Sequence, residues 1–180
     1  MKSINQYIQE KLFVKKKTYK YFPKTKEELK EIIRDHIDEF GYECNLNDID
    51  TSKITDMHGL FSWTSTTGFN GDISEWDVSN VESMEFMFES SEFDGDLSDW
   101  DTSNVKNMRG MFESSQFSGE NGSISNWDVS KVENMERMFA YNRKFNQDIS
   151  NWKVYKVKAK KRMYMFDNCP IAKKYKPKFN

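Results

Sequence analysis

Residues 76–88 read WDVSNVESMEFMF, and the stretch recurs as WDTSNVKNMRGMF at 100–112 and as WDVSKVENMERMF at 127–139. The tryptophans that open these copies, together with Trp152 after them, follow one another at 24, 27 and 25 residues. A phenylalanine series from Phe61 to Phe166 keeps the same register, with steps of 27, 24, 27 and 27. Two aromatic series in one register predict a tandem array of about five repeats of about 25 residues, with degenerate copies at both ends.

Each repeat carries a pattern typical of one short helix and one short extended segment. The apolar stripe from Val81 to Phe88, with steps i, i+3, i+6 and i+7, predicts a helix of two turns. The following stretch 93–100, which contains Gly95, predicts a turn into a short strand that pairs with the same segment one repeat away. We therefore expect an α/β fold, a leucine-rich-repeat-like solenoid.

A separate element precedes the repeats. Thr25 and Glu28 form a capping box, an apolar stripe runs from Leu29 to Phe40, and Gly41 follows, so we expect an amphipathic helix that covers the open end of the first repeat. A second short helix is predicted at 4–12. The chain thus divides into an N-terminal cap (1–47), the repeat solenoid (48–171) and a basic C-terminal tail (172–180).

The combined Trp, Asp-x-Ser-Asn-Val and Met-x-x-Met-Phe signature resembles the bacterial surface protein repeat of about 26 residues, the BspA-type leucine-rich-repeat group known from mycoplasma lipoproteins. The likeness extends from Asp48 to Ile171. It implies a right-handed leucine-rich-repeat-like solenoid for adhesion or protein binding, without catalytic residues. Many relatives are exported or lipid-anchored, whereas others are short proteins of phages and mobile elements.

The formal net charge of −2 conceals a strong partition along the chain. Residues 49–151 hold seven Lys or Arg against nineteen Asp or Glu, whereas residues 152–180 hold ten against one. Such asymmetry concerns partners and solubility rather than fold. The sequence shows no signal peptide, transmembrane span or lipidation motif, so we expect a cytoplasmic protein without membrane contact, unless an export segment has been removed.

The recurring Asp-x-Ser pairs fit either a calcium ladder or helix capping. We favour capping, because Ser79 with Glu82 and Ser130 with Glu133 form capping boxes and the glycine-rich calcium-binding nonapeptide is absent. The Asp72, Asp96 and Asp148 series fits turn chemistry better than a metal chain.

The Met and Phe stripes are assigned to the core. The tryptophan series fits either a packed column or an exposed ladder, and we favour packing because large aromatic side chains usually supply core area. Trp63 stands outside the repeat register and is a candidate contact residue. Cys44 and Cys169 lie on opposite sides of the repeats, so we expect them to remain unbridged.

No catalytic or metal-binding pattern emerges. His36 and His58 lack the Cys or acidic neighbours of a zinc site or a catalytic triad. No phosphate-binding loop or dinucleotide fingerprint is present. We therefore expect a protein that is not an enzyme and that uses no cofactor and no metal.

The leading hypothesis is a monomeric protein-binding module whose acidic repeat surface engages a basic macromolecular partner. If that partner binds nucleic acid, the acidic block could act as an inhibitor that imitates a phosphate backbone. The candidate partner-binding residues are Trp63, Glu82, Glu85, Glu89, Glu92, Asp94, Lys106, Arg109, Glu113, Glu133, Glu136 and Arg137.

Two other functions stay open. One is a surface adhesin or virulence protein made from an exported precursor. The other is nucleic-acid binding through the C-terminal lysines, which alternate with Tyr155, Tyr164 and Tyr175 and could contact phosphates while the rings stack on bases. A solubilising end cap explains the same lysines, and we favour it over nucleic-acid binding.

Overall fold

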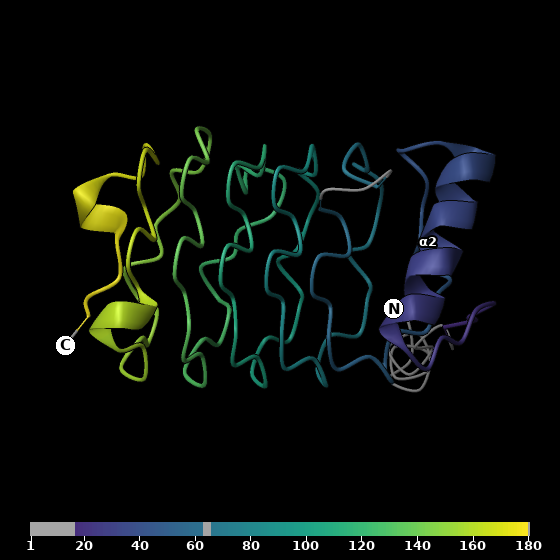
Figure 1. Ribbon diagram of the computed structural model, residues 1–180, viewed down its shortest axis with the longest axis horizontal. Coiled ribbons are helices and arrows are strands. Elements are labelled where there is room, and N and C mark those ends of the chain that lie inside the picture. Colours follow the sequence, from purple (N-terminus) through teal and green to yellow (C-terminus); the bar gives the residue numbers. More distant parts are fainter. Residues whose placement is uncertain (1–16, 63–65, 180) are drawn as a thin grey trace, which may run out of the picture.

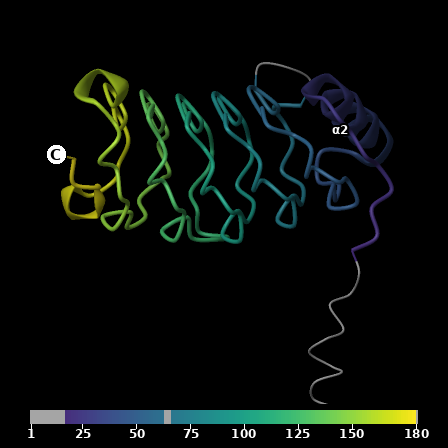
Figure 2. The ribbon, with the colours of Figure 1, turned by 90° about the horizontal axis from the view of Figure 1, so that it is seen from below.

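The repeats follow one another as a row of loops that lie side by side, with a helix at one end (Figure 1). The computed structural model describes residues 17–62 and 66–179. Helix α2 (Lys26–Phe40) stands at the N-terminal end of the row, and the 3-10 helices η1 (Ala159–Lys161) and η2 (Lys173–Tyr175) stand at the C-terminal end. The row keeps its order when seen from below (Figure 2). The helix predicted at 4–12 and the contact residue Trp63 lie outside the described residues.

The α/β solenoid predicted from the sequence is wrong. Within 17–62 and 66–179, the repeats contain no α-helix and no strand, and they consist of turns and bends joined by isolated bridges. The fold class is therefore a stack of loops with one α-helix.

Consecutive turns replace the helix predicted at 81–88. The Met87 N–H donates to the Met84 carbonyl at 3.2 Å, and Phe86 between them has a φ of 53°, in the left-handed region. A type II turn requires a positive φ at this third position. Two other copies place glycine there, Gly59 with φ 60° and Gly110 with φ 58°. A right-handed helix cannot pass through a left-handed residue, so each copy turns instead.

The N–H groups that a helix would use internally are donated to the next repeat. Phe86 donates to the Arg109 carbonyl at 2.8 Å, and Phe88 donates to the Met111 carbonyl at 2.9 Å. Isolated parallel bridges follow the same line through four copies, at Asp56, Ser83, Asn107 and Asn134. The backbone pairing between the central repeats therefore lies in the methionine-rich segment. At 93–100, where the sequence predicts it, side chains make the contact, as when the Asp94 N–H donates to the Asn70 side chain at 2.8 Å, although the equivalent segment at the N-terminal end has a parallel bridge between Asn45 and Asp72.

Stacked phenylalanine rings fill the core. The rings of Phe61, Phe88, Phe112, Phe139 and Phe166 follow one another with centroids 5.4, 5.6, 5.5 and 5.8 Å apart. A second series packs beside the first within each repeat, as when Phe117 lies 4.2 Å from Phe112. Offset stacking of this kind adds to the free energy gained by burying the rings. The methionines of the same segment are buried with them, which confirms the predicted core.

The tryptophans form a packed column, as favoured from the sequence. Trp76, Trp100, Trp127 and Trp152 are each 3–4% exposed. Each indole N–H donates to a carbonyl of the preceding repeat, as Trp127 does to Leu97 at 2.9 Å. A buried indole needs such an acceptor, so the column also fixes the register between neighbouring repeats.

Helix α2 closes the N-terminal end as predicted. The Thr25 hydroxyl accepts from the Glu28 N–H at 3.2 Å, and Gly41 ends the helix with a φ of 82°. Leu29 and Ile33 are buried against the first repeat. Cys44 and Cys169 are both free thiols, as expected.

Replacing Phe112 by alanine tests the ring stack. The substitution removes a ring that contacts Phe88, Phe117 and Phe139, and we expect the free energy of unfolding to fall by about 3–5 kcal/mol in urea denaturation. The control is Phe40→Ala, whose ring is 61% exposed and whose effect should stay under about 0.5 kcal/mol. Equal effects of the two substitutions would contradict a stability that depends on the ring column.

A second test addresses the left-handed turns. Ser90 is exposed and has a φ of 55°, so Ser90→Gly removes a steric penalty and should raise the free energy of unfolding by about 1 kcal/mol. Asn126 is also exposed but is not in the left-handed region, so Asn126→Gly should lower stability by roughly 0.5 kcal/mol. Thermal and urea unfolding measure both changes. A loss of stability in Ser90→Gly would show that Ser90 carries no steric penalty in the left-handed conformation.

Candidate protein-binding face

The residues proposed from the sequence as a partner site form ion pairs with one another. Glu82 lies 2.9 Å from the Lys106 ammonium, and Glu85 lies 3.2 Å from the Arg109 guanidinium, which is 3.7 Å from Glu136 on its other side. These pairs join successive repeats. They occur because equivalent repeat positions become neighbours in the stack.

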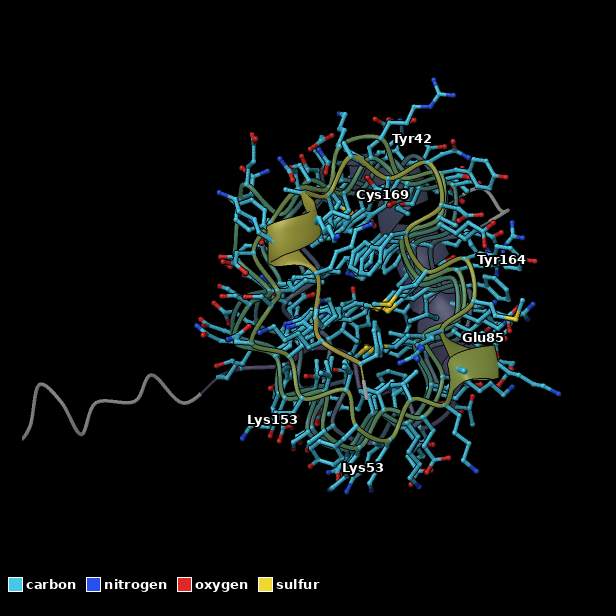
Figure 3. All side chains as sticks on the ribbon, turned by 90° about the vertical axis from the view of Figure 1, so that its left-hand side faces the viewer. Tyr42, Lys53, Glu85, Lys153, Tyr164 and Cys169 are labelled. Carbon is cyan, nitrogen blue, oxygen red and sulfur yellow. The ribbon has the colours of Figure 1, made fainter. Side chains whose placement is uncertain are left out.

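The Glu85 pair is part of a larger cluster. His58 lies 3.7 Å from the Glu85 carboxylate, and Asn107 donates to the same carboxylate at 2.9 Å. The Arg109 guanidinium also lies over the Phe86 ring at 4.9 Å, within cation–π range. Glu85 lies on the same side of the molecule as Tyr164, away from Lys153 (Figure 3).

A second ion pair, between Glu113 and Arg137, is partly buried. The Glu113 side chain is only 8% exposed, and the Arg137 Nε donates to both carboxylate oxygens at 2.9 Å. Hydrogen bonding to Glu113 raises the pKa of Arg137 above its ordinary value. The buried carboxylate depends on this arginine, because an unpaired buried charge is strongly destabilising.

The other candidates differ in their surroundings. Asp94 accepts hydrogen bonds from the Ser118 N–H at 2.7 Å and from its hydroxyl. Glu92 and Glu133 are exposed, and Glu89 is half-buried. Seven of the twelve proposed residues are thus neutralised by one another within the chain.

A different face carries uncompensated acidic residues. We call it the turn-aspartate face, and it consists of Asp72, Glu75, Asp77, Asp96, Asp99 and Asp101. All are exposed except the half-exposed Asp77. In the described part of the chain, the one ion pair to this set joins Lys17 to Glu75 at 3.3 Å. The sequence contains a signal for this face, because no Lys or Arg occurs from 54 to 105.

The segments that carry this face lie side by side. The Asn104 side chain donates to the Ser79 carbonyl at 2.7 Å, and the Trp100 indole donates to the Ile73 carbonyl at 3.2 Å. The carboxylates of one repeat therefore lie beside those of the next.

Turns, and not helix caps, hold the aspartates. The Asp77 carboxylate accepts from the Ser79 N–H at 3.0 Å and from its hydroxyl at 2.6 Å. Asp101 accepts in the same way from the Ser103 N–H at 3.0 Å. No helix follows Ser79 or Ser130, so the predicted capping boxes are wrong, and Asp-x-Ser is an Asx turn. The turn assignment for the Asp72, Asp96 and Asp148 series is confirmed.

The same hydrogen bonds shift the titration of three aspartates. Hydrogen bonds from the Ser130 hydroxyl and N–H lower the pKa of Asp128, and those from Ser150 lower the pKa of Asp148. At Asp72, burial acts in the opposite direction, but the hydrogen bonds from Ser74 contribute to a pKa that is lowered overall. These carboxylates are therefore ionised at neutral pH.

Metal ligands do not gather in the described residues. No group of three or more His, Cys, Asp or Glu side chains there could hold an ion. His36 is a buried residue of α2, with Nδ1 2.8 Å from the Ile32 carbonyl. Between 17 and 179, gap 63–65 excepted, no helix has the length and apolar character needed to cross a bilayer.

Comparison with protein families places the chain. The model of the family described as Mycoplasma protein of unknown function, DUF285, matches residues 28–123 and 114–176. The chain belongs to this family. DUF285 is a repeat family related to bacterial surface proteins, and its match covers α2, the repeats and the turn-aspartate face. No curated protein and no solved structure matches the chain.

The Asx turn at Asp128 gives a pH test. A carboxylate whose pKa is lowered by folding contributes stability above its unfolded pKa of about 3.9, and that contribution is lost as the pH falls through the folded value. In Ser130→Ala, the hydroxyl that donates to Asp128 is lost, and we expect the pKa of Asp128 to rise toward its ordinary value, measured by NMR of the carboxyl carbon. Stability should then fall less between neutral and acidic pH than in the unaltered chain. With Ser114→Ala as the control, an unmoved Asp128 pKa in Ser130→Ala would contradict this account.

Proposed function

We propose that this DUF285 chain is a non-enzymatic binding protein whose turn-aspartate face engages a basic protein partner. The observation that carries the proposal is the contrast between two acidic sets. The acids at Glu82, Glu85 and Glu113 have cations within 4 Å, whereas those of the turn-aspartate face, Glu75 excepted, have none in the described residues. Unpaired carboxylates on neighbouring repeats favour a partner rich in Lys and Arg.

Rigidity supports the same proposal. The carboxylates of Asp72, Asp77, Asp96 and Asp101 accept hydrogen bonds from their own turns at 2.8–3.0 Å. Side chains that are already ordered lose little conformational entropy on binding. A pre-ordered acidic surface also steers a basic protein toward it at low ionic strength.

Binding fits the chain better than catalysis because of where its two histidines lie. His36 is 6% exposed and packs 4.6 Å from the Tyr21 ring. His58 is exposed but faces Glu85 at the edge of the ion-pair cluster. Among the described residues, the polar partners of the two imidazoles are the Ile32 carbonyl, Asp48 and Glu85, and none of these is a hydroxyl or thiol.

Charge removal at one place tests the face. The triple variant Asp96→Asn, Asp99→Asn and Asp101→Asn keeps the oxygens that accept from the turns and removes three charges. At roughly 0.5 kcal/mol per exposed pair, we expect the Kd for a fluorescent arginine-rich peptide to rise about tenfold, measured by anisotropy. The natural partner, captured from lysate by the unaltered chain, should be lost in parallel.

The matched control is Glu27→Gln, Glu31→Gln and Asp35→Asn, which removes equal charge from the exposed surface of α2. Its Kd should stay within a factor of about two, because only distant charge is lost. Equal weakening in both variants would sink the proposal, since net charge alone would explain it. If the captured partner binds nucleic acid, an oligonucleotide should compete for it, as expected of an inhibitor that imitates phosphate.

The BspA-type assignment gives a second candidate, a surface adhesin. Its support is the repeat signature at 76–88, 100–112 and 127–139 within a family related to bacterial surface proteins. Protease treatment of intact cells that produce the protein from its native gene distinguishes the two. Digestion of the protein favours the adhesin, and protection favours an internal partner.

A further inference from the structure

The last repeat departs from the stack. From Val157 to Met165 it is two residues longer than the equivalent stretch from Val132 to Met138. The extra residues fall around η1, and the series of parallel bridges ends at Asn134. In the earlier repeats, the backbone N–H at this position donates to the carbonyl of the equivalent residue one repeat before, as the Glu133 N–H does to the Lys106 carbonyl at 2.8 Å. No described residue of the last repeat donates to the Glu133 carbonyl.

This departure opens a cleft beside η1. The cleft has a volume of about 730 Å³, within the range of about 300–1,000 Å³ that is usual for ligand sites. Its lining comes from three successive repeats and consists of Lys106, Asn107, Glu133, Asn134, Tyr155, Lys156, Lys158 and Lys161. The first regular repeats line a hollow of about 450 Å³ at equivalent positions, with Lys53 as its one lysine, so the last repeat makes this surface wider and more basic.

The lining is basic, with one exposed aromatic ring. Lys156, Lys158 and Lys161 are exposed, and no carboxylate among the described residues lies within 4 Å of their ammonium groups. Lys106 is already paired with Glu82. The Tyr155 side chain is 59% exposed and adjoins the three unpaired lysines.

We propose that this cleft binds single-stranded nucleic acid. Three unpaired ammonium groups suit successive phosphates, and an exposed tyrosine ring offers a base a stacking surface. The Nδ2 group of Asn134 has no hydrogen-bond partner in the described residues and can donate to a base edge or a phosphate.

Other anionic partners use this surface less well. An acidic peptide gains nothing from stacking on Tyr155, and a flat membrane surface cannot follow a cleft whose lining includes Glu133. The site is separate from the turn-aspartate face and does not depend on the function proposed for that face.

The test is anisotropy of the full chain with a fluorescent dodecathymidylate at several salt concentrations. In the triple variant Lys156→Gln, Lys158→Gln and Lys161→Gln, we expect at least a tenfold rise in Kd, and the slope of log K against log salt should shrink by about 2, since each phosphate contact contributes about 0.7. Tyr155→Ala should weaken oligonucleotide binding about tenfold and leave binding of inorganic polyphosphate unchanged.

The control variant removes equal charge at Lys144, Lys173 and Lys174. Figure 3 shows η2, which holds Lys173 and Lys174, on the opposite side of the C-terminal end from η1, and Lys144 does not line the cleft. Equal losses in the two triple variants, or tighter binding of anionic vesicles or a polyglutamate peptide than of the oligonucleotide, would overturn the proposal. The variant of Asp96, Asp99 and Asp101 should bind the oligonucleotide undiminished, which separates this proposal from the previous one.

Discussion

The donation of backbone N–H groups from one repeat to the carbonyls of the next is the constraint on which the other features depend. Phe86 and Phe88 donate to Arg109 and Met111, and these bonds hold equivalent positions of successive repeats in register. Each Phe ring can then lie 5.4–5.8 Å from the next ring in its column. Buried backbone groups must be paired, so the ring column and the hydrogen bonds require each other.

The same register determines the surface. When equivalent positions become neighbours, a Glu in one copy and an Arg in the next form an ion pair, as Glu85 and Arg109 do. Where neighbouring copies both keep an acid, the described residues supply no cation within 4 Å, as at Asp77 and Asp101; a lysine takes this position in the last copy, at Lys153. Pairing and exposure therefore follow from repeat alignment more than from total charge.

Much of the fold could be predicted from the sequence, because period and burial are direct consequences of the aromatic series. The core rings and the tryptophan column follow from that reasoning, and helix α2 follows from its capping box and apolar stripe. The helix at 81–88 failed because steps of three residues fit successive turns as well as they fit a helix. Gly59 and Gly110, at the repeat position of Phe86, are consistent with a left-handed backbone there. Phe86 and Arg137 adopt the same conformation although residues with a Cβ atom disfavour it, so the sequence does not predict it in those copies.

The sequence offers charged residues as a partner site, but charge alone does not show that most of them pair with one another across the repeats. Aligning Glu85 with Arg109 and Glu136 would have revealed the ladder, and the gap in Lys and Arg from 54 to 105 would have revealed the unpaired face. The cleft could not be predicted from the sequence, because the length of an insertion does not determine the direction in which a loop bends.

A chain with net charge −2 can present two chemically opposite surfaces when different repeats carry them. The ladder of Glu85, Arg109 and Glu136 and the pair of Glu113 with Arg137 join acids to bases of neighbouring repeats, so these charges largely offset one another. At physiological ionic strength, charges more than about 8 Å apart are largely screened from one another, so each surface acts mainly on the groups of a partner that come close to it. Because each repeat contacts only its neighbours, the inserted residues of the last repeat could open a basic cleft without disturbing the acidic face two repeats away.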